Sequence, residues 1–91
     1  MKDNQREVLL IAQEECAEVT QAISKVFRFG LDSVFKGITN QEHLEEEVGD
    51  LMCMIDLLID TGVVREGAVM AARDEKFNKL AQWSDIFADE K

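Results

Sequence analysis

Apolar residues recur every three to four positions along most of the chain, the spacing of amphipathic helices, and no proline interrupts it. Gly30 suits the C-cap of a first helix, residues 31–39 suit a loop or a short irregular turn, and residues 84–91 suit a frayed or short helical tail. The pattern predicts one all-α domain over residues 1–91, a bundle of three main helices with or without a short fourth. The predicted helices run from about Asp3, as N-cap, to about Phe29, from Thr39 or Asn40 to about Thr61, and from about Val64 to about Trp83.

A carboxylate lies on the predicted core face of the first helix. At about 100° per residue, Glu15 falls near the centre of the apolar stripe, and Glu14 and Glu18 lie close to it. Like charges this close repel unless a proton or a cation intervenes. The stripe comprises Val8, Ile11, Ala12, Val19, Ala22, Ile23 and Val26.

The second helix is apolar almost all round between Leu51 and Ile59, which implies burial on more than one side. A single thin domain does not provide that burial, so self-association is expected. Beside its main stripe, Glu47 and Asp50 share a face with Met54 and Leu58, so carboxylates continue an apolar surface here too. The main stripe comprises Leu44, Val48, Leu51, Met52, Ile55 and Ile59.

Carboxylates on core-facing positions need a neutralising partner, because an unpaired buried charge costs several kcal/mol. On helical phase alone, Glu15 and Asp50 are compatible with a structural Lys or Arg or with a metal ion. The third helix carries Lys76 and Lys79 on or beside the side expected to meet the bundle, so acids and cations can converge. The remaining glutamates of the second helix are interpreted as a solvated face: Glu42, Glu45 and Glu46.

Composition narrows the function classes. The 91 residues carry a formal net charge of −9, which argues against binding a nucleic-acid polymer. The same charge is compatible with small phosphorylated ligands when a divalent metal stands between carboxylates and phosphates. Cys16 and Cys53 lack zinc-type spacing and are predicted to be core residues, and His43 is interpreted as a first-turn surface residue. One histidine leaves no nucleophilic triad and no di-iron site.

No apolar run is long enough for a signal peptide or a membrane span, so a cytoplasmic location and no membrane partner are expected.

Three motifs at helical spacing carry a family resemblance: E-E-C-A-E at 14–18, E-V-G-D at 47–50 and E-K-F-N-K at 75–79. The chain resembles, over about residues 8 to 80, the MazG-type all-α nucleoside triphosphate pyrophosphohydrolases, whose hallmark is E-E-x-x-E followed by E-x-x-D. The resemblance implies a Mg²⁺-dependent enzyme, with Mn²⁺ as a possible substitute, that hydrolyses a nucleoside triphosphate to the monophosphate and pyrophosphate.

The resemblance also implies residue roles. Lys76 matches a phosphate-contacting lysine, with Lys79 where arginine is common, whereas Asp74 stands where many relatives carry asparagine. Glu14 matches the first glutamate of the motif, a ligand or a water-activating base, and is taken with Glu15 as catalytic. The implied metal ligands are Glu15, Glu18, Glu47 and Asp50.

A basic and aromatic segment precedes Gly30. In it, Lys25 and Arg28 are candidates for contacting a phosphate or a base, and Phe27 and Phe29 either join them or pack between subunits.

Members of this family form tight homodimers, sometimes dimers of dimers, and short single-domain versions are frequent among phage and prophage proteins. Two alternatives stay open at this point. One is a phosphoribosyl-ATP pyrophosphohydrolase, which shares the fold and the metal carboxylates. The other is a non-catalytic helical dimer that binds a nucleotide or a protein partner through the same acidic groove.

Overall fold

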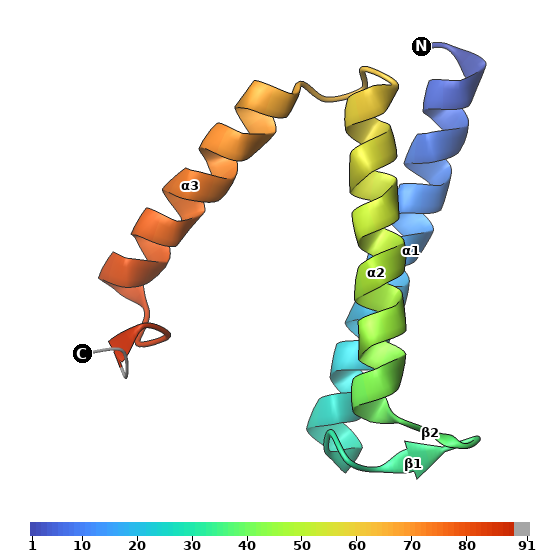
Figure 1. The fold of residues 1–91 in the computed structure, drawn as a ribbon, viewed down its shortest axis with the longest axis vertical. Helices are drawn as coiled ribbons and strands as arrows, with labels where there is room; N and C mark the ends of the chain where they lie inside the picture. Colours follow the sequence, from blue (N-terminus) through green and yellow to red (C-terminus); the bar gives the residue numbers. More distant parts are fainter. Residues whose placement is uncertain (89–91) are drawn as a thin grey trace.

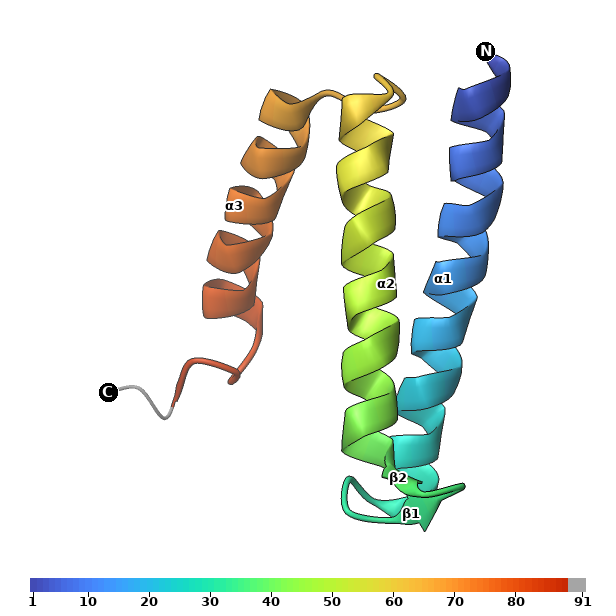
Figure 2. The same cartoon turned by 45° about the vertical axis from the view of Figure 1, so that its right-hand side comes forward.

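The computed structural model describes residues 1–88, which form three α-helices and a short β-hairpin (Figure 1). The first two helices run antiparallel and lie side by side, and the third stands apart from both in two views (Figures 1 and 2). The predicted all-α class with three main helices is therefore confirmed. The elements are α1 (Asp3–Phe29), β1 (Val34–Phe35), β2 (Ile38–Thr39), α2 (Asn40–Asp60) and α3 (Glu66–Trp83).

The N-terminal cap of α2 agrees with the one that the sequence predicts. The Thr39 side chain accepts a hydrogen bond from the Glu42 backbone N–H, and the Glu42 carboxylate accepts one from the Thr39 N–H, each at 3.0 Å. This reciprocal capping box satisfies two backbone donors at the helix start. Glu42 is thus a capping residue, and Glu45 and Glu46 are exposed, as predicted.

The C-terminal end of α1 agrees with the prediction, and its N-terminal end differs. Gly30 has a positive φ of 92°, which favours glycine, and its N–H donates to the Val26 carbonyl at 2.8 Å. At the other end the N-cap is Lys2 rather than Asp3. The reason is local, because the Gln5 side-chain oxygen accepts from the Lys2 N–H at 2.9 Å and closes the first turn one residue earlier.

A tight hairpin occupies the segment predicted as a loop or irregular turn. Val34 pairs with Thr39 and Phe35 with Ile38 in an antiparallel register. Lys36 and Gly37 both have positive φ, at 53° and 86°, as a two-residue type I′ connection requires. The sequence signal for this hairpin is the set of β-branched and aromatic residues on either side of a glycine-containing pair.

The hairpin is anchored to the end of α1 by a buried amide. Asn40 is only 5% exposed, and its Nδ2 donates to the Gly30 carbonyl at 3.0 Å. Its backbone N–H donates to the Ser33 carbonyl at 2.9 Å. These bonds hold the hairpin against the ends of both long helices.

The core between α1 and α2 is thin. Among residues 1–88, four apolar residues are buried, and the partly buried Leu58 packs against three of them, Val8, Ala12 and Met54. Met54, 7% exposed, is the buried apolar residue of α2, and Ala22 the most buried of α1. The buried apolar residues are Val8, Ala12, Ala22 and Met54.

Within the single chain, one apolar face of α2 is left uncovered, and the prediction that both cysteines are buried is wrong. The face of α2 that meets α1 is the one bearing Met54, not the main stripe, and Met52 on that stripe is 62% exposed. One partner helix covers only a narrow sector of α2, which leaves the rest of its apolar surface in solvent. Cys16 and Cys53, predicted as core residues, are exposed for the same reason.

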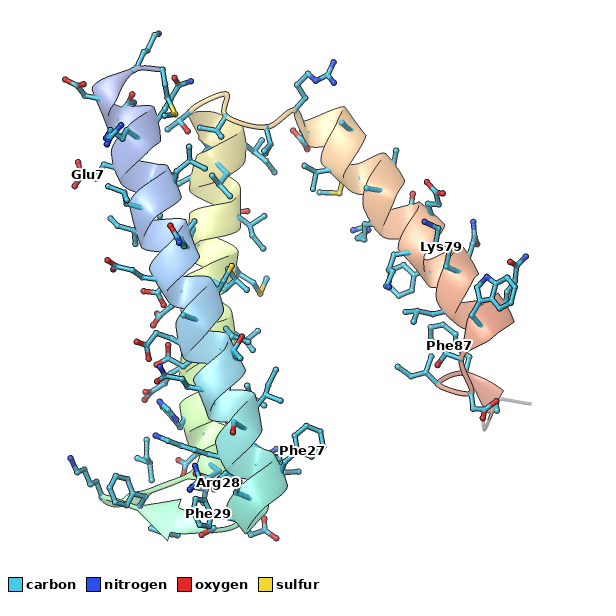
Figure 3. The ribbon with its side chains drawn as sticks, turned by 180° about the vertical axis from the view of Figure 1, so that it is seen from behind. Glu7, Phe27, Arg28, Phe29, Lys79 and Phe87 are labelled. Atoms are coloured by element: carbon cyan, nitrogen blue, oxygen red, sulfur yellow. The ribbon has the colours of Figure 1, made fainter. Side chains whose placement is uncertain are left out.

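Helix α3 begins at Glu66, two residues later than predicted, and follows a short connection from Gly62. The structure describes every residue of α3, and none of them is buried. After the helix the chain folds back, and the ring of Phe87 lies 6.4 Å from that of Phe77, measured between centroids (Figure 3). Part of the predicted tail, residues 89–91, lies outside the described residues.

Within residues 1–88, no helix combines the length and the apolar character that crossing a membrane requires.

Candidate metal centre

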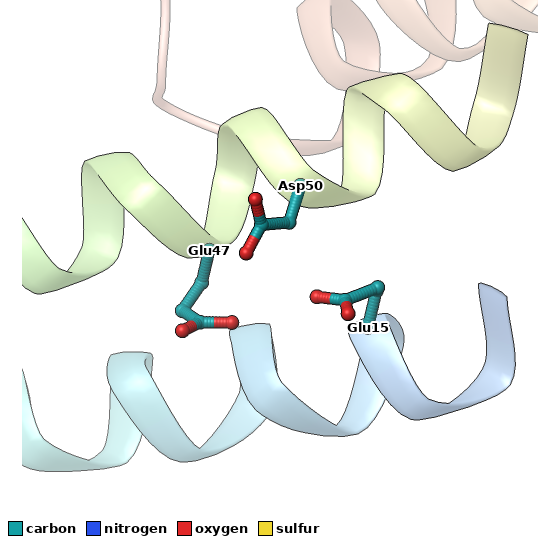
Figure 4. A group of neighbouring side chains, drawn as sticks. All are labelled: Glu15, Glu47 and Asp50. Atoms are coloured by element: carbon teal, nitrogen blue, oxygen red, sulfur yellow. The ribbon is translucent and has the colours of Figure 1, made fainter. Parts of the chain in front are cut away.

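Three carboxylates from two helices converge between α1 and α2. Glu15 projects from α1, and Glu47 and Asp50 project from α2 toward it (Figure 4). One carboxylate oxygen from each residue lies within 4.8 Å of the others. Ligand oxygens on opposite sides of one Mg²⁺ are about 4.2 Å apart, given Mg–O distances of 2.0–2.1 Å. The cluster therefore has nearly the dimensions of a single cation site.

The local structure explains this convergence. Glu15 follows Val8 and Ala12 on the face of α1 that packs on α2, so its side chain is half-buried, as predicted from helical phase. Glu47 and Asp50 are three residues apart and share a face of α2 one turn before the buried Met54. The packing that buries the apolar residues thus also brings the carboxylates together.

Glu15 has the least satisfied carboxylate of the cluster. Its Oε2 is buried and has no hydrogen-bond partner among residues 1–88. Burial raises the pKa of Glu15 above its ordinary value, and the nearby negative charges of Asp50, Glu47, Glu18 and Glu14, in that order, raise the pKa further. A buried carboxyl oxygen in this environment requires either a proton or a cation.

No Lys or Arg side chain of the described residues neutralises the carboxylate cluster. Within residues 1–88, no Lys or Arg forms an ion pair with Glu15, Glu47 or Asp50. Of the two partners that the sequence left open, an intrachain Lys or Arg is therefore not seen. The donor set, oxygen atoms from carboxylates, is the one that Mg²⁺ and Mn²⁺ prefer.

The other two glutamates of the first motif lie at the edge of the cluster. Glu14 and Glu18 are both exposed, and neither belongs to the three residues whose oxygens converge. Both are near enough to raise the pKa of Glu15. The structure thus brings together three of the four implied metal ligands and places Glu18 beside them.

His43, which the sequence predicts as a surface residue, is a neighbour of the cluster. Its Nε2 lies 3.4 Å from Oε1 of Glu47, one turn further along α2, and its side chain is only 24% exposed. The signal was present in the spacing, since positions i and i+4 face each other on a helix.

The candidate phosphate-binding residues fall into two groups. Lys25 is half-buried near the end of α1, and the Arg28 guanidinium lies 4.9 Å from the centroid of the Phe29 ring. Phe27 points away and is 86% exposed (Figure 3). These residues are all on α1, the helix that carries Glu15.

The basic residues of α3 are placed differently. Lys79 lies on α3 (Figure 3), and its ammonium is 3.5 Å from Oε1 of Glu75 on the same helix. Lys76 is exposed, and Asp74 contacts Arg73 at 3.2 Å. Within the described residues of one chain, these lysines form no ion pair with the carboxylates of α1 and α2.

The raised pKa of Glu15 predicts how the stability of the metal-free protein depends on pH. In the pH range above the ordinary Glu value of 4.5, the folded state holds this proton more tightly than the unfolded state. The free energy of unfolding therefore falls as pH rises from that value through the raised pKa of Glu15. Denaturant titrations in EDTA across this range should show the fall, and Glu15→Gln should flatten it. An identical pH profile for both proteins would contradict the assignment.

No family model, curated protein or solved structure matches this chain. Its function has therefore to be inferred from the motif pattern together with the geometry of this carboxylate cluster.

Proposed function

We propose that the protein is a Mg²⁺-dependent nucleoside triphosphate pyrophosphohydrolase, which hydrolyses ribo- or deoxyribonucleoside triphosphates to the monophosphate and pyrophosphate. The observation that carries the proposal is the convergence of Glu15, Glu47 and Asp50 around a buried carboxyl oxygen that lacks a partner within residues 1–88. A cluster of this kind suits a divalent cation better than it suits packing alone, because mutual repulsion destabilises the metal-free form.

Glu15, Glu47 and Asp50 would hold the cation, and Glu18, exposed beside them, would contribute from the edge. Bound there, Mg²⁺ would supply positive charge to the substrate phosphates and increase the acidity of a water molecule. Mn²⁺ prefers similar oxygen ligands and is expected to substitute. The acidic cluster would thereby accept an anionic substrate that it otherwise repels.

The reaction needs a base and a way to neutralise the leaving group. The water oxygen bonds to the α-phosphorus, and the bond from this phosphorus to the α–β bridging oxygen breaks. Pyrophosphate departs with the bonding electrons, and Glu14, exposed beside the cluster, accepts the proton of the water. Lys25 and Arg28, both near the end of α1, are the candidate phosphate contacts.

Lys76 and Lys79 would contact the substrate only in an assembly of several chains. They stand on α3, away from the carboxylates of their own chain, so we assign any contact with substrate to a homodimer or a dimer of dimers. The exposed apolar residues of α2, such as Met52 and Ile55, support such an assembly. A thin single-chain core supports it too, since a chain this short gains stability by burying surface against a second copy.

A substrate panel tests the function. The purified protein is incubated with ribo- and deoxyribonucleoside triphosphates and with phosphoribosyl-ATP, in Mg²⁺ and in EDTA. We expect Mg²⁺-dependent release of monophosphate and pyrophosphate from at least one nucleoside triphosphate, and none in EDTA. Turnover of phosphoribosyl-ATP alone would replace the proposal with the histidine-biosynthetic reaction. Mg²⁺ binding with no turnover on the whole panel would indicate a non-catalytic binding protein.

A further inference from the structure

A pocket adjoins the carboxylate cluster where α1 and α2 meet the β-hairpin. Its volume is about 210 Å³, and it is lined by residues from all three elements. Lys25 contributes from α1, Phe35 and Lys36 from the hairpin, and His43 from α2. The buried Asn40 lies in its wall, so the pocket is held by the same hydrogen bonds that anchor the hairpin.

The pocket is a concentration of positive charge in an acidic protein. The Lys25 and Lys36 ammonium groups lie 6.0 Å and 5.4 Å from the centroid of the same Phe35 ring. Neither lysine forms an ion pair with a carboxylate of residues 1–88. With a formal net charge of −9 on the whole chain, two unpaired cations beside one pocket favour an anionic occupant.

The pocket and the metal centre are neighbours through His43. This residue lines the pocket, and its Nε2 is 3.4 Å from the Glu47 carboxylate that belongs to the cluster. On α1, Lys25 follows Glu15 of the cluster by ten residues, an axial distance of roughly 15 Å, whereas on α2 His43 precedes Glu47 by four residues, roughly 6 Å. An extended anion that passes His43 would therefore reach from a cation held at Glu47 to the lysines of the pocket.

We propose that this pocket binds the pyrophosphate end of the substrate, its β- and γ-phosphates, through Lys25 and Lys36. The inference rests on the proposed function and adds an orientation, with the departing group toward the hairpin. The two ammonium groups already lie near the Phe35 ring, so a polyphosphate suits the pocket better than a nucleobase stacked on that ring. During hydrolysis the lysines neutralise charge on the departing pyrophosphate.

Calorimetric binding of inorganic pyrophosphate, with Mg²⁺ present, tests the pocket without requiring turnover. Lys36→Asn removes a cation at a position whose φ of 53° asparagine tolerates, and Lys25→Met keeps the apolar stem that packs in the wall. Lys2→Met, with the same change of charge on an exposed residue, is the control. We expect each pocket variant to weaken pyrophosphate binding about tenfold and the control to leave it unchanged. Inorganic phosphate should bind more weakly than pyrophosphate.

Unchanged pyrophosphate affinity in both pocket variants would overturn the inference. If the wild type also hydrolysed a nucleoside triphosphate, the proposed function would stand and only the pocket assignment would fail. Lysine-dependent pyrophosphate binding without turnover would have the opposite meaning, since the pocket would stand and the function would fall. The KM for the substrate should rise in both variants while Mg²⁺ affinity stays the same.

Discussion

Replacing Glu15 with glutamine is expected to lower Mg²⁺-dependent hydrolysis by at least about 10²-fold, the scale on which single catalytic groups act. Glu15 supplies the buried oxygen at the centre of the cluster, and a neutral amide is a weaker ligand for a cation than a carboxylate. The shape of the side chain is kept, so the loss reports charge and ligation rather than packing. Steady-state rates of pyrophosphate release, measured at several Mg²⁺ concentrations, give the size of the effect.

Glu7→Gln is the matched control, because Glu7 is on the same helix, is exposed and lies outside the cluster (Figure 3). It should hydrolyse substrate at the wild-type rate. Without metal, Glu15→Gln should be as stable as the wild type or more stable, since it removes repulsion from Asp50 and Glu47. Full activity in a folded Glu15→Gln protein would place the reaction elsewhere.

Introducing a lysine at Met52 is expected to convert an oligomer into a monomer. Met52 is 62% exposed in the single chain and belongs to an apolar stripe of α2 that α1 does not cover. A charge there costs little in the monomer but would be desolvated in a helical interface. Sedimentation velocity at micromolar concentration should show the wild type at two or four times the chain mass of 10.3 kDa and Met52→Lys at one.

Asp60→Asn changes the charge by the same amount on the same helix and is directed away from the stripe, so it should keep the wild-type assembly. A wild-type protein that sediments as a folded 10.3 kDa monomer would refute the assembly proposal. It would also remove the route by which Lys76 and Lys79 are expected to reach the site.

Local signals made the long helices and the central carboxylate predictable from the sequence. The bounds of α1 and α2 follow from caps at Gly30 and Thr39, and Glu15 stands out because a charge interrupts an apolar face. These features depend on residues within a few turns of each other. Helical phase therefore predicts them without knowledge of the tertiary structure.

The missed features depend on which surfaces meet. The phase of α2 offers two apolar faces, and only the packing against α1 selects the one with Met54. The periodicity of α3 predicts a face that meets the bundle, with Lys76 and Lys79 on or beside it, whereas α3 stands apart from α1 and α2 (Figures 1 and 2). The direction of the chain after Gly62 had no signal in that periodicity. The spacing of four residues predicts the contact between His43 and Glu47. Its importance depends on the position of Glu47 in the carboxylate cluster, which the sequence does not give.

The most direct test of the central claim is a phosphorus NMR time course of wild-type protein with a nucleoside triphosphate and Mg²⁺. We predict resonances of the monophosphate and of pyrophosphate growing together in equal amounts, and no change when EDTA is added first. Formation of diphosphate with inorganic phosphate would contradict the account, because cleavage would then lie between the β- and γ-phosphates. Equal rates with and without EDTA would also contradict it, because the carboxylate cluster would then have no part in the reaction.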